Sequence, residues 1–150
     1  MGGALAQLLS NPVLEVSFLA WFIAQSLKVV HTLVKEKRLN FRRFVGAGGM
    51  PSSHSAFVTS LATAIGQRTG WASPVTALAW VFAMIVMYDA AGVRQAAGKQ
   101  AEILNQIVDD LYHGGRVRED RLKELLGHSP VEVLAGAALG VVIAALFTPR

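Results

Sequence analysis

The chain has 150 residues, of which 53% are hydrophobic and 16% are charged, and its mean hydropathy is +0.43. This apolar content is too concentrated for a soluble domain of this length, and it falls into blocks long enough to cross a bilayer. The formal net charge is +4, and neither a basic region nor a small-residue cleavage site precedes Val13, so no removable signal peptide is predicted. Because the sequence contains no cysteine, disulfides and thiolate metal sites are excluded.

We therefore predict an all-α integral membrane helical bundle, with a single membrane-embedded domain over residues 1–150. Apolar blocks predict about four transmembrane helices, at about residues 13–34, 55–70, 74–91 and 130–147. In the first block, Gln25, Lys28 and His31 are three residues apart and share a helical face, which should look into the bundle because polar groups are costly in lipid. Lys28 could instead extend to the headgroup level with no further role.

Glycines and serines surround His54 in the stretch GAGGMPSSHSA, residues 46–56. Pro51 and the serines predict a helix that begins near Ser52 or Ser53 and carries His54 in its first turn. The free N–H groups and positive dipole of such a helix end favour a phosphate. The alternative is a serine-capped membrane helix whose histidine sits at the headgroup level.

The least apolar part lies between the third and fourth blocks. Residues 95–126 carry apolar side chains at helical spacing against charged ones, and this pattern predicts an amphipathic interfacial helix on the membrane or on the bundle. The fourth block contains Gly136 and Gly140 as a GxxxG pair, which could serve packing within the bundle or a homo-oligomer.

Threading these spans through a bilayer collects most basic residues on one side. That side carries Lys35, Lys37, Arg38, Arg42, Arg43, Arg94, Lys99, Arg116, Arg118, Arg121 and Lys123, against Arg68 and Arg150 on the other. By the positive-inside rule, this multi-pass protein should place the side with His54 and His128 in the cytoplasm.

The start of the fourth block reads Ser129-x-x-Glu132 with Pro130 between them, which is a helix capping box. The cap does not explain His128, immediately before it. A carboxylate four residues after an imidazole could hold one ring nitrogen and leave the other as a nucleophile or base. Both interpretations of Glu132 stay open at this point.

Three blocks in this order, GMPSSHS at 49–55, YDAAGVR at 88–94 and GHSPVEVLAG at 127–136, resemble the divergent branch of the phosphatidic acid phosphatase type 2 superfamily, which is related to vanadium-dependent haloperoxidases. The resemblance covers nearly the whole chain. It implies that His54 is the general acid, that His128 is the nucleophile forming a phosphohistidine, and that Glu132 orients it. Ser53 stands where the wider family has glycine, and Glu132 where it has aspartate.

The resemblance also implies a set of phosphate-binding residues, for which the candidates are Lys28, Arg94, Arg42, Arg43, Ser52 and Ser53. Which of Arg38, Arg42 and Arg43 completes the set is left open by their spacing. Asp89 and Lys99 are expected to support the site without touching phosphate.

The predicted function is hydrolysis of a lipid phosphate monoester or pyrophosphate, with no metal or other cofactor. The predicted partners are the substrate and membrane lipids, and no nucleic acid. A non-catalytic protein that binds or moves phospholipid headgroups is the alternative. Two further alternatives are a metal site and a serine hydrolase; the first would use His54, Asp89, His128 and Glu132, and the second Ser53 or Ser55.

Overall fold

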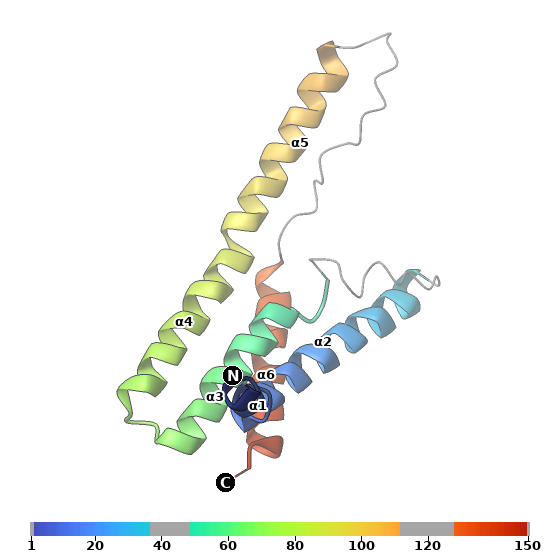
Figure 1. The fold of residues 1–150 in the computed structure, drawn as a ribbon. Coiled ribbons are helices and arrows are strands. Elements are labelled where there is room, and N and C mark those ends of the chain that lie inside the picture. The colour runs from blue at the N-terminus through green and yellow to red at the C-terminus, as the bar shows by residue number, and fades with distance from the viewer. Residues whose placement is uncertain (1, 37–48, 112–127, 150) are drawn as a thin grey trace.

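The computed structural model describes residues 2–36, 49–111 and 128–149, and every regular element within them is a helix (Figure 1). The elements are α1 (Gly2–Leu9), α2 (Pro12–Glu36), α3 (Ser53–Thr69), α4 (Pro74–Ala91), α5 (Val93–Leu111) and α6 (Pro130–Phe147). The predicted all-α membrane bundle is confirmed.

Helix α3 is the centre of this bundle, because α2, α4 and α6 all pack against it. Ten of its 17 residues are buried, and several of these are serines and threonines. Two of these hydroxyls donate to backbone carbonyls of neighbouring helices: Thr59 Oγ1, which donates to Ser55 O at 2.8 Å, also lies 3.1 Å from Ala137 O on α6, and Ser60 Oγ lies 3.4 Å from Val16 O on α2. The surrounding helices therefore shield a helix that is too polar to face lipid alone.

The expected count of about four transmembrane spans needs correction. Among the described residues, three windows are long and apolar enough to cross a membrane: Pro12–Val34, Pro74–Asn105 and Pro130–Phe147. The second span, expected at 55–70, does form α3, but α3 has only 17 residues and a polar composition. Helices α2, α4 and α6 pack around α3 and separate its polar side chains from lipid.

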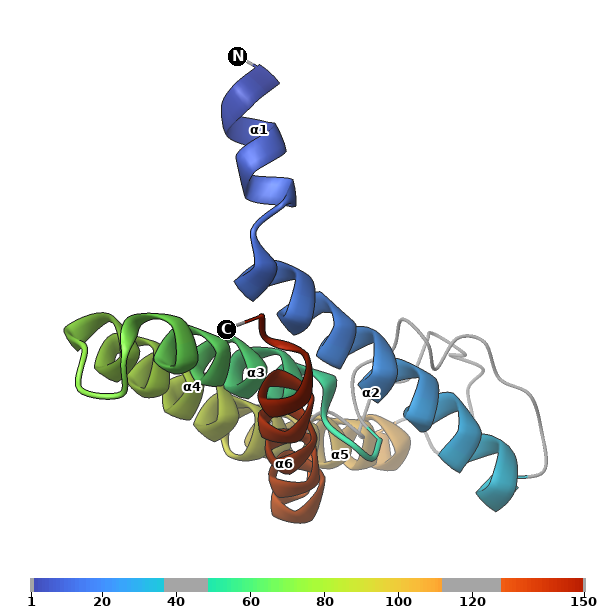
Figure 2. The same cartoon turned by 90° about the horizontal axis from the view of Figure 1, so that it is seen from below.

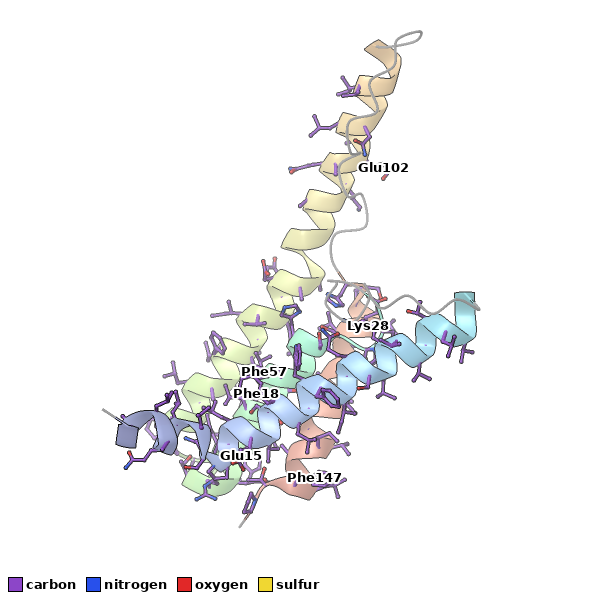
Figure 3. The ribbon with its side chains drawn as sticks, turned by 45° about the vertical axis from the view of Figure 1, so that its right-hand side comes forward. Glu15, Phe18, Lys28, Phe57, Glu102 and Phe147 are labelled. Carbon is purple, nitrogen blue, oxygen red and sulfur yellow. The ribbon has the colours of Figure 1, made fainter. Side chains whose placement is uncertain are left out.

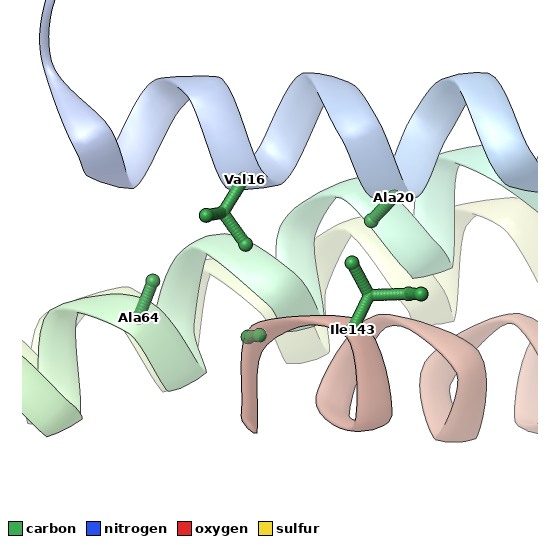
Figure 4. Packing of buried hydrophobic residues seen from close by; sticks show 5 residues of the cluster. Val16, Ala20, Ala64 and Ile143 are labelled. Carbon is green, nitrogen blue, oxygen red and sulfur yellow. The ribbon is translucent and has the colours of Figure 1, made fainter. Parts of the chain in front are cut away.

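Small residues let α3 and α6 approach closely. A Cβ added at Gly136 would clash with the carbonyl of Ser52, and one added at Gly140 would clash with the carbonyl of Ala56. The sequence left open whether Gly136 and Gly140 pack within the bundle or in a homo-oligomer. In the structure, this GxxxG face packs against α3 within the bundle. Further from the site, Val16, Ala20, Ala64, Ile143 and Ala144 form a core where α2, α3 and α6 meet (Figure 4).

Helix α5 follows α4 directly after Gly92, and it extends beyond the rest of the bundle (Figure 1). Among the described elements it packs against α4 alone. It exposes four large apolar residues, Ile103, Leu104, Ile107 and Val108. The amphipathic helix predicted from residue 95 thus begins at Val93, while residues 112–126 of that prediction lie outside the described residues.

The end of the bundle away from His54 holds the C-terminus and the α3–α4 turn. Arg68 Nη1 donates to Pro149 O at 3.1 Å and ties these two segments together. The sequence analysis did not predict α1, an exposed helix that precedes α2 and points away from the bundle (Figure 2).

Candidate functional site

At the opposite end of the bundle, the end of α4 and the C-terminal half of α2 meet the starts of α3 and α6. The Ser52 amide, just before α3, donates to the carbonyl of Glu132 in the first turn of α6 at 2.9 Å. The His128 amide, just before α6, donates to the carbonyl of Ala90 at the end of α4 at 3.0 Å. The C-terminal half of α2 reaches the same place through Lys28. These backbone bonds fix the two histidine-bearing segments relative to each other.

The start of α3 is where the sequence placed it. Ser52 is the N-cap, and its Oγ accepts hydrogen bonds from Ser55 N at 3.3 Å and from Ser55 Oγ at 3.0 Å. Because the Ser52 amide donates to Glu132, that amide belongs to the scaffold, although it was predicted to bind phosphate. The first turn of α3 also contains the amides of Ser53 and His54, and the N–H groups of a helix start favour an anion.

Lys28 is buried, with 1% of its side chain exposed, so it does not extend to the headgroup level. Its Nζ donates to Ser53 Oγ at 3.5 Å. Gly49, at φ +90°, lies against its stem, and a Cβ there would come within 3.2 Å of Lys28 Cγ. The hydroxyl of Ser53, at the position where the wider family has glycine, thus contacts the lysine that we predicted for the phosphate. Figure 3 shows Lys28 on α2.

The predicted polar face of α2 is partly wrong. Gln25 and Lys28 are buried, but His31 is exposed and Thr32 continues the buried face instead. Steps of three and then four residues follow the 3.6-residue helical repeat, whereas two steps of three drift away from it.

The two histidines lie side by side. Their ring centroids are 6.2 Å apart and the ring planes are inclined at 76°. His128 is 2% exposed, whereas His54 is on the surface of the bundle. At this separation both imidazoles can reach one tetrahedral group, one of them at phosphorus and the other at a bridging oxygen.

Glu132 forms the capping box at the start of α6. Its Oε2 accepts from Ser129 N at 3.0 Å, and Ser129 Oγ accepts from Glu132 N at 3.3 Å. The cap interpretation of this residue is therefore confirmed, and its role in orienting His128 stays a prediction.

Other predicted site residues are placed less fully. Arg38, Arg42 and Arg43 lie outside the described residues, and so does the side chain of Arg94, the second residue of α5. Asp89 is half-buried and directly precedes Ala90, which binds the His128 amide. Lys99 is exposed on α5.

The metal-site and serine-hydrolase alternatives gain no support from the described residues. Within the described parts of the chain, no three His, Asp or Glu side chains are grouped so that they could hold a metal ion. The hydroxyl of Ser53 accepts from Lys28 and that of Ser55 donates to Ser52. These contacts suit a structured helix start better than a serine nucleophile.

Beside His54 lies an apolar groove that the sequence analysis missed. Its volume is about 290 Å³, and its lining residues are Phe18, Trp21, His54, Phe57, Val58 and Val86. The signal was present in the sequence, because Phe18, Trp21, Gln25 and Lys28 follow one another at helical spacing on α2.

Comparison with known proteins identifies the family of the chain. A sequence model described as the Divergent PAP2 family matches residues 9–143. The chain belongs to this family. The Divergent PAP2 protein is also similar to a protein of Bacillus subtilis (strain 168) described as "Uncharacterized membrane protein YuiD", at 37% identity over 148 residues, covering 91% of this chain and 94% of the relative. No solved structure matches the chain.

Proposed function

We propose that this Divergent PAP2 protein is an integral membrane phosphatase that hydrolyses a lipid phosphate monoester or pyrophosphate through a phosphohistidine. The observation that carries the proposal is the meeting of a buried lysine with two neighbouring histidines at the start of a helix. Lys28 places a positive charge 3.5 Å from the Ser53 hydroxyl, and the dipole of α3 is positive at the same end. Both favour an anion at this position, and a phosphate offers oxygens for the ammonium and the amides together.

The two histidines can divide the chemistry between them. A ring nitrogen of neutral His128 attacks phosphorus, a P–N bond forms and the P–O bond to the lipid breaks. Protonated His54, at the surface of the bundle, gives its proton to the leaving oxygen. Water then attacks the phosphohistidine and passes its proton to His54, the P–N bond breaks, and inorganic phosphate leaves. Because one histidine starts neutral and the other protonated, we expect a bell-shaped dependence of kcat/KM on pH.

The test is phosphate release from a panel of lipid phosphates by purified protein in detergent. His128→Ala should reduce turnover to background because it removes the attacking nitrogen. The matched control is His31→Ala, which changes an exposed histidine of α2 and should leave turnover at the wild-type level. Wild-type turnover in the His128→Ala protein would overturn the phosphohistidine.

One observation favours the non-catalytic alternative. The Glu132 carboxylate is engaged with the Ser129 amide, so the residue that should orient His128 already has a structural task. A protein that binds lipid phosphates at this site but releases no phosphate from any of them would be a headgroup-binding protein instead.

A further inference from the structure

The groove beside His54 lies where the backbones of two helices stand apart. Helices α2 and α4 both pack against α3, but within the described residues no Cα atom of α2 lies within 8 Å of a Cα atom of α4. Helix α3 therefore forms the floor, through Phe57 and Val58, and α2 and α4 form the walls. Figure 1 shows α3 between these two helices.

Apart from His54, every side chain that lines the groove is apolar. Phe18 and Phe57 form part of the lining as an edge-to-face pair, with ring centroids 5.3 Å apart (Figure 3). Phe18 is 58% exposed on a helix long and apolar enough to span the membrane, so the groove opens toward lipid. Water finds few hydrogen-bond partners in such a space, whereas a hydrocarbon chain needs none and buries apolar surface there.

The groove is continuous with the candidate phosphate site. His54 belongs to both. On α2, Phe18 and Trp21 line the groove, and Lys28 follows two turns after Trp21 on the same face, with its ammonium near Ser53. The face thus changes from apolar to cationic along one direction, which matches an amphiphile with its charge at one end.

We infer that this groove holds the part of the lipid tail next to the phosphate, and that the lipid enters sideways from the bilayer between α2 and α4. The inference rests on the proposed function for the identity of the polar end. The phosphate then lies at Lys28, Ser53 and His54, and the chain runs over Phe57 and Val58. A water-soluble phosphomonoester would leave the groove empty and forgo this binding free energy.

Other occupants fit less well. A transmembrane helix of a second copy is about 10–12 Å across with its side chains and rises about 5.4 Å per turn, so that even one turn fills roughly 400 Å³ or more. This exceeds the groove volume of about 290 Å³. A single hydrocarbon chain is the narrowest apolar partner that the bilayer supplies.

The test is photolabelling with a single-chain lipid phosphate that carries a diazirine in its chain, on the full-length protein in detergent. We expect labels on Phe57 or Val58, which form the floor and which a lipid on the outer surface does not reach. Filling the groove with Val86→Phe should reduce these labels about tenfold, whereas Ile85→Phe, on the exposed neighbour, should not. Labels confined to the exposed faces of α2 and α4 would overturn the inference.

A second pair of variants, which shortens side chains instead of enlarging them, tests the inference even if Val86→Phe fails to fold. Phe18→Ala removes one wall and should weaken labelling of the floor roughly 2- to 10-fold. Phe22→Ala removes a phenylalanine of similar exposure, 54% against 58%, that is one turn further along α2 and does not line the groove, so it should leave the labelling unchanged. Equal floor labelling in the Phe18→Ala, Val86→Phe and wild-type proteins would also contradict the inference.

Labelling requires no turnover, so the two proposals fail separately. Floor labels without phosphate release would keep the lipid groove and refute the phosphatase. Phosphate release from long-chain substrates without floor labels would keep the phosphatase and refute the groove.

Discussion

Gln25 and Lys28 lie about one turn apart on the buried face of α2, and they require different partners. The Lys28 ammonium is a donor that favours an anion, and it already contacts Ser53 Oγ. Gln25 is 5% exposed, and its buried Oε1 accepts no hydrogen bond from any described group. An acceptor in this position suits a substrate that carries a hydroxyl or amide donor close to its phosphate.

Replacing Gln25 tests whether its Oε1 serves to bind a ligand and not to stabilise the ligand-free bundle. A buried polar atom that lacks a hydrogen bond costs about 1–3 kcal/mol, so Gln25→Met, which keeps the volume, should raise the Tm of the ligand-free protein by a few degrees. The measurement is thermal unfolding in detergent. Leu27→Met, on an exposed neighbour, is the control and should leave the Tm unchanged. A lower Tm for Gln25→Met would mean that the amide stabilises the ligand-free bundle.

Single residues were predicted from the sequence where local chemistry decides them. The caps at Ser52 and Ser129 needed only neighbouring residues, and both were found. The burial of Lys28 followed from the cost of a charge in lipid. The exposure of His31 and the loss of the Ser52 amide to Glu132 did not follow, because each depends on which segment packs opposite.

At the scale of elements, α3 shows why hydropathy alone miscounts the spans. Its sequence is rich in Ser, Thr and Ala, a composition that favours close helix packing more than contact with lipid. Only the arrangement of α2, α4 and α6 around it gives its hydroxyls a protected place. The groove escaped prediction for the same reason, since it arises from the separation of the α2 and α4 backbones on either side of α3.

The α3–α6 crossing gives a prediction about stability. Gly140→Ala would place a methyl group against the Ala56 carbonyl and the Thr59 hydroxyl, two groups of the buried helix that have little room to move. We expect destabilisation of about 1–3 kcal/mol, measured as a lower Tm in detergent. Gly3→Ala in α1, where an added Cβ meets nothing within 4 Å, is the control and should change the Tm little. An unchanged Tm for Gly140→Ala would show that the two helices can separate easily.

In the whole molecule, the helix ends gather at two opposite ends of the bundle. At the histidines, the end of α4 and the C-terminal half of α2 meet the starts of α3 and α6, while the α3–α4 turn and Pro149 lie together at the other end. The site is therefore assembled from segments that are far apart in sequence. The groove adjoins this site at His54.

The orientation of this assembly in the membrane is the last prediction. Because most lysines and arginines fall on the side of the histidines, we expect that side to face the cytoplasm. The chain has no cysteine, so single introduced thiols need no altered background. In intact cells, an impermeant thiol reagent should label Gln67→Cys, on the exposed last turn of α3, and should label Lys99→Cys, on exposed α5, only after the membrane is opened. Labelling of Lys99→Cys from outside intact cells would reverse the orientation, and the groove would then draw its lipid from the outer leaflet.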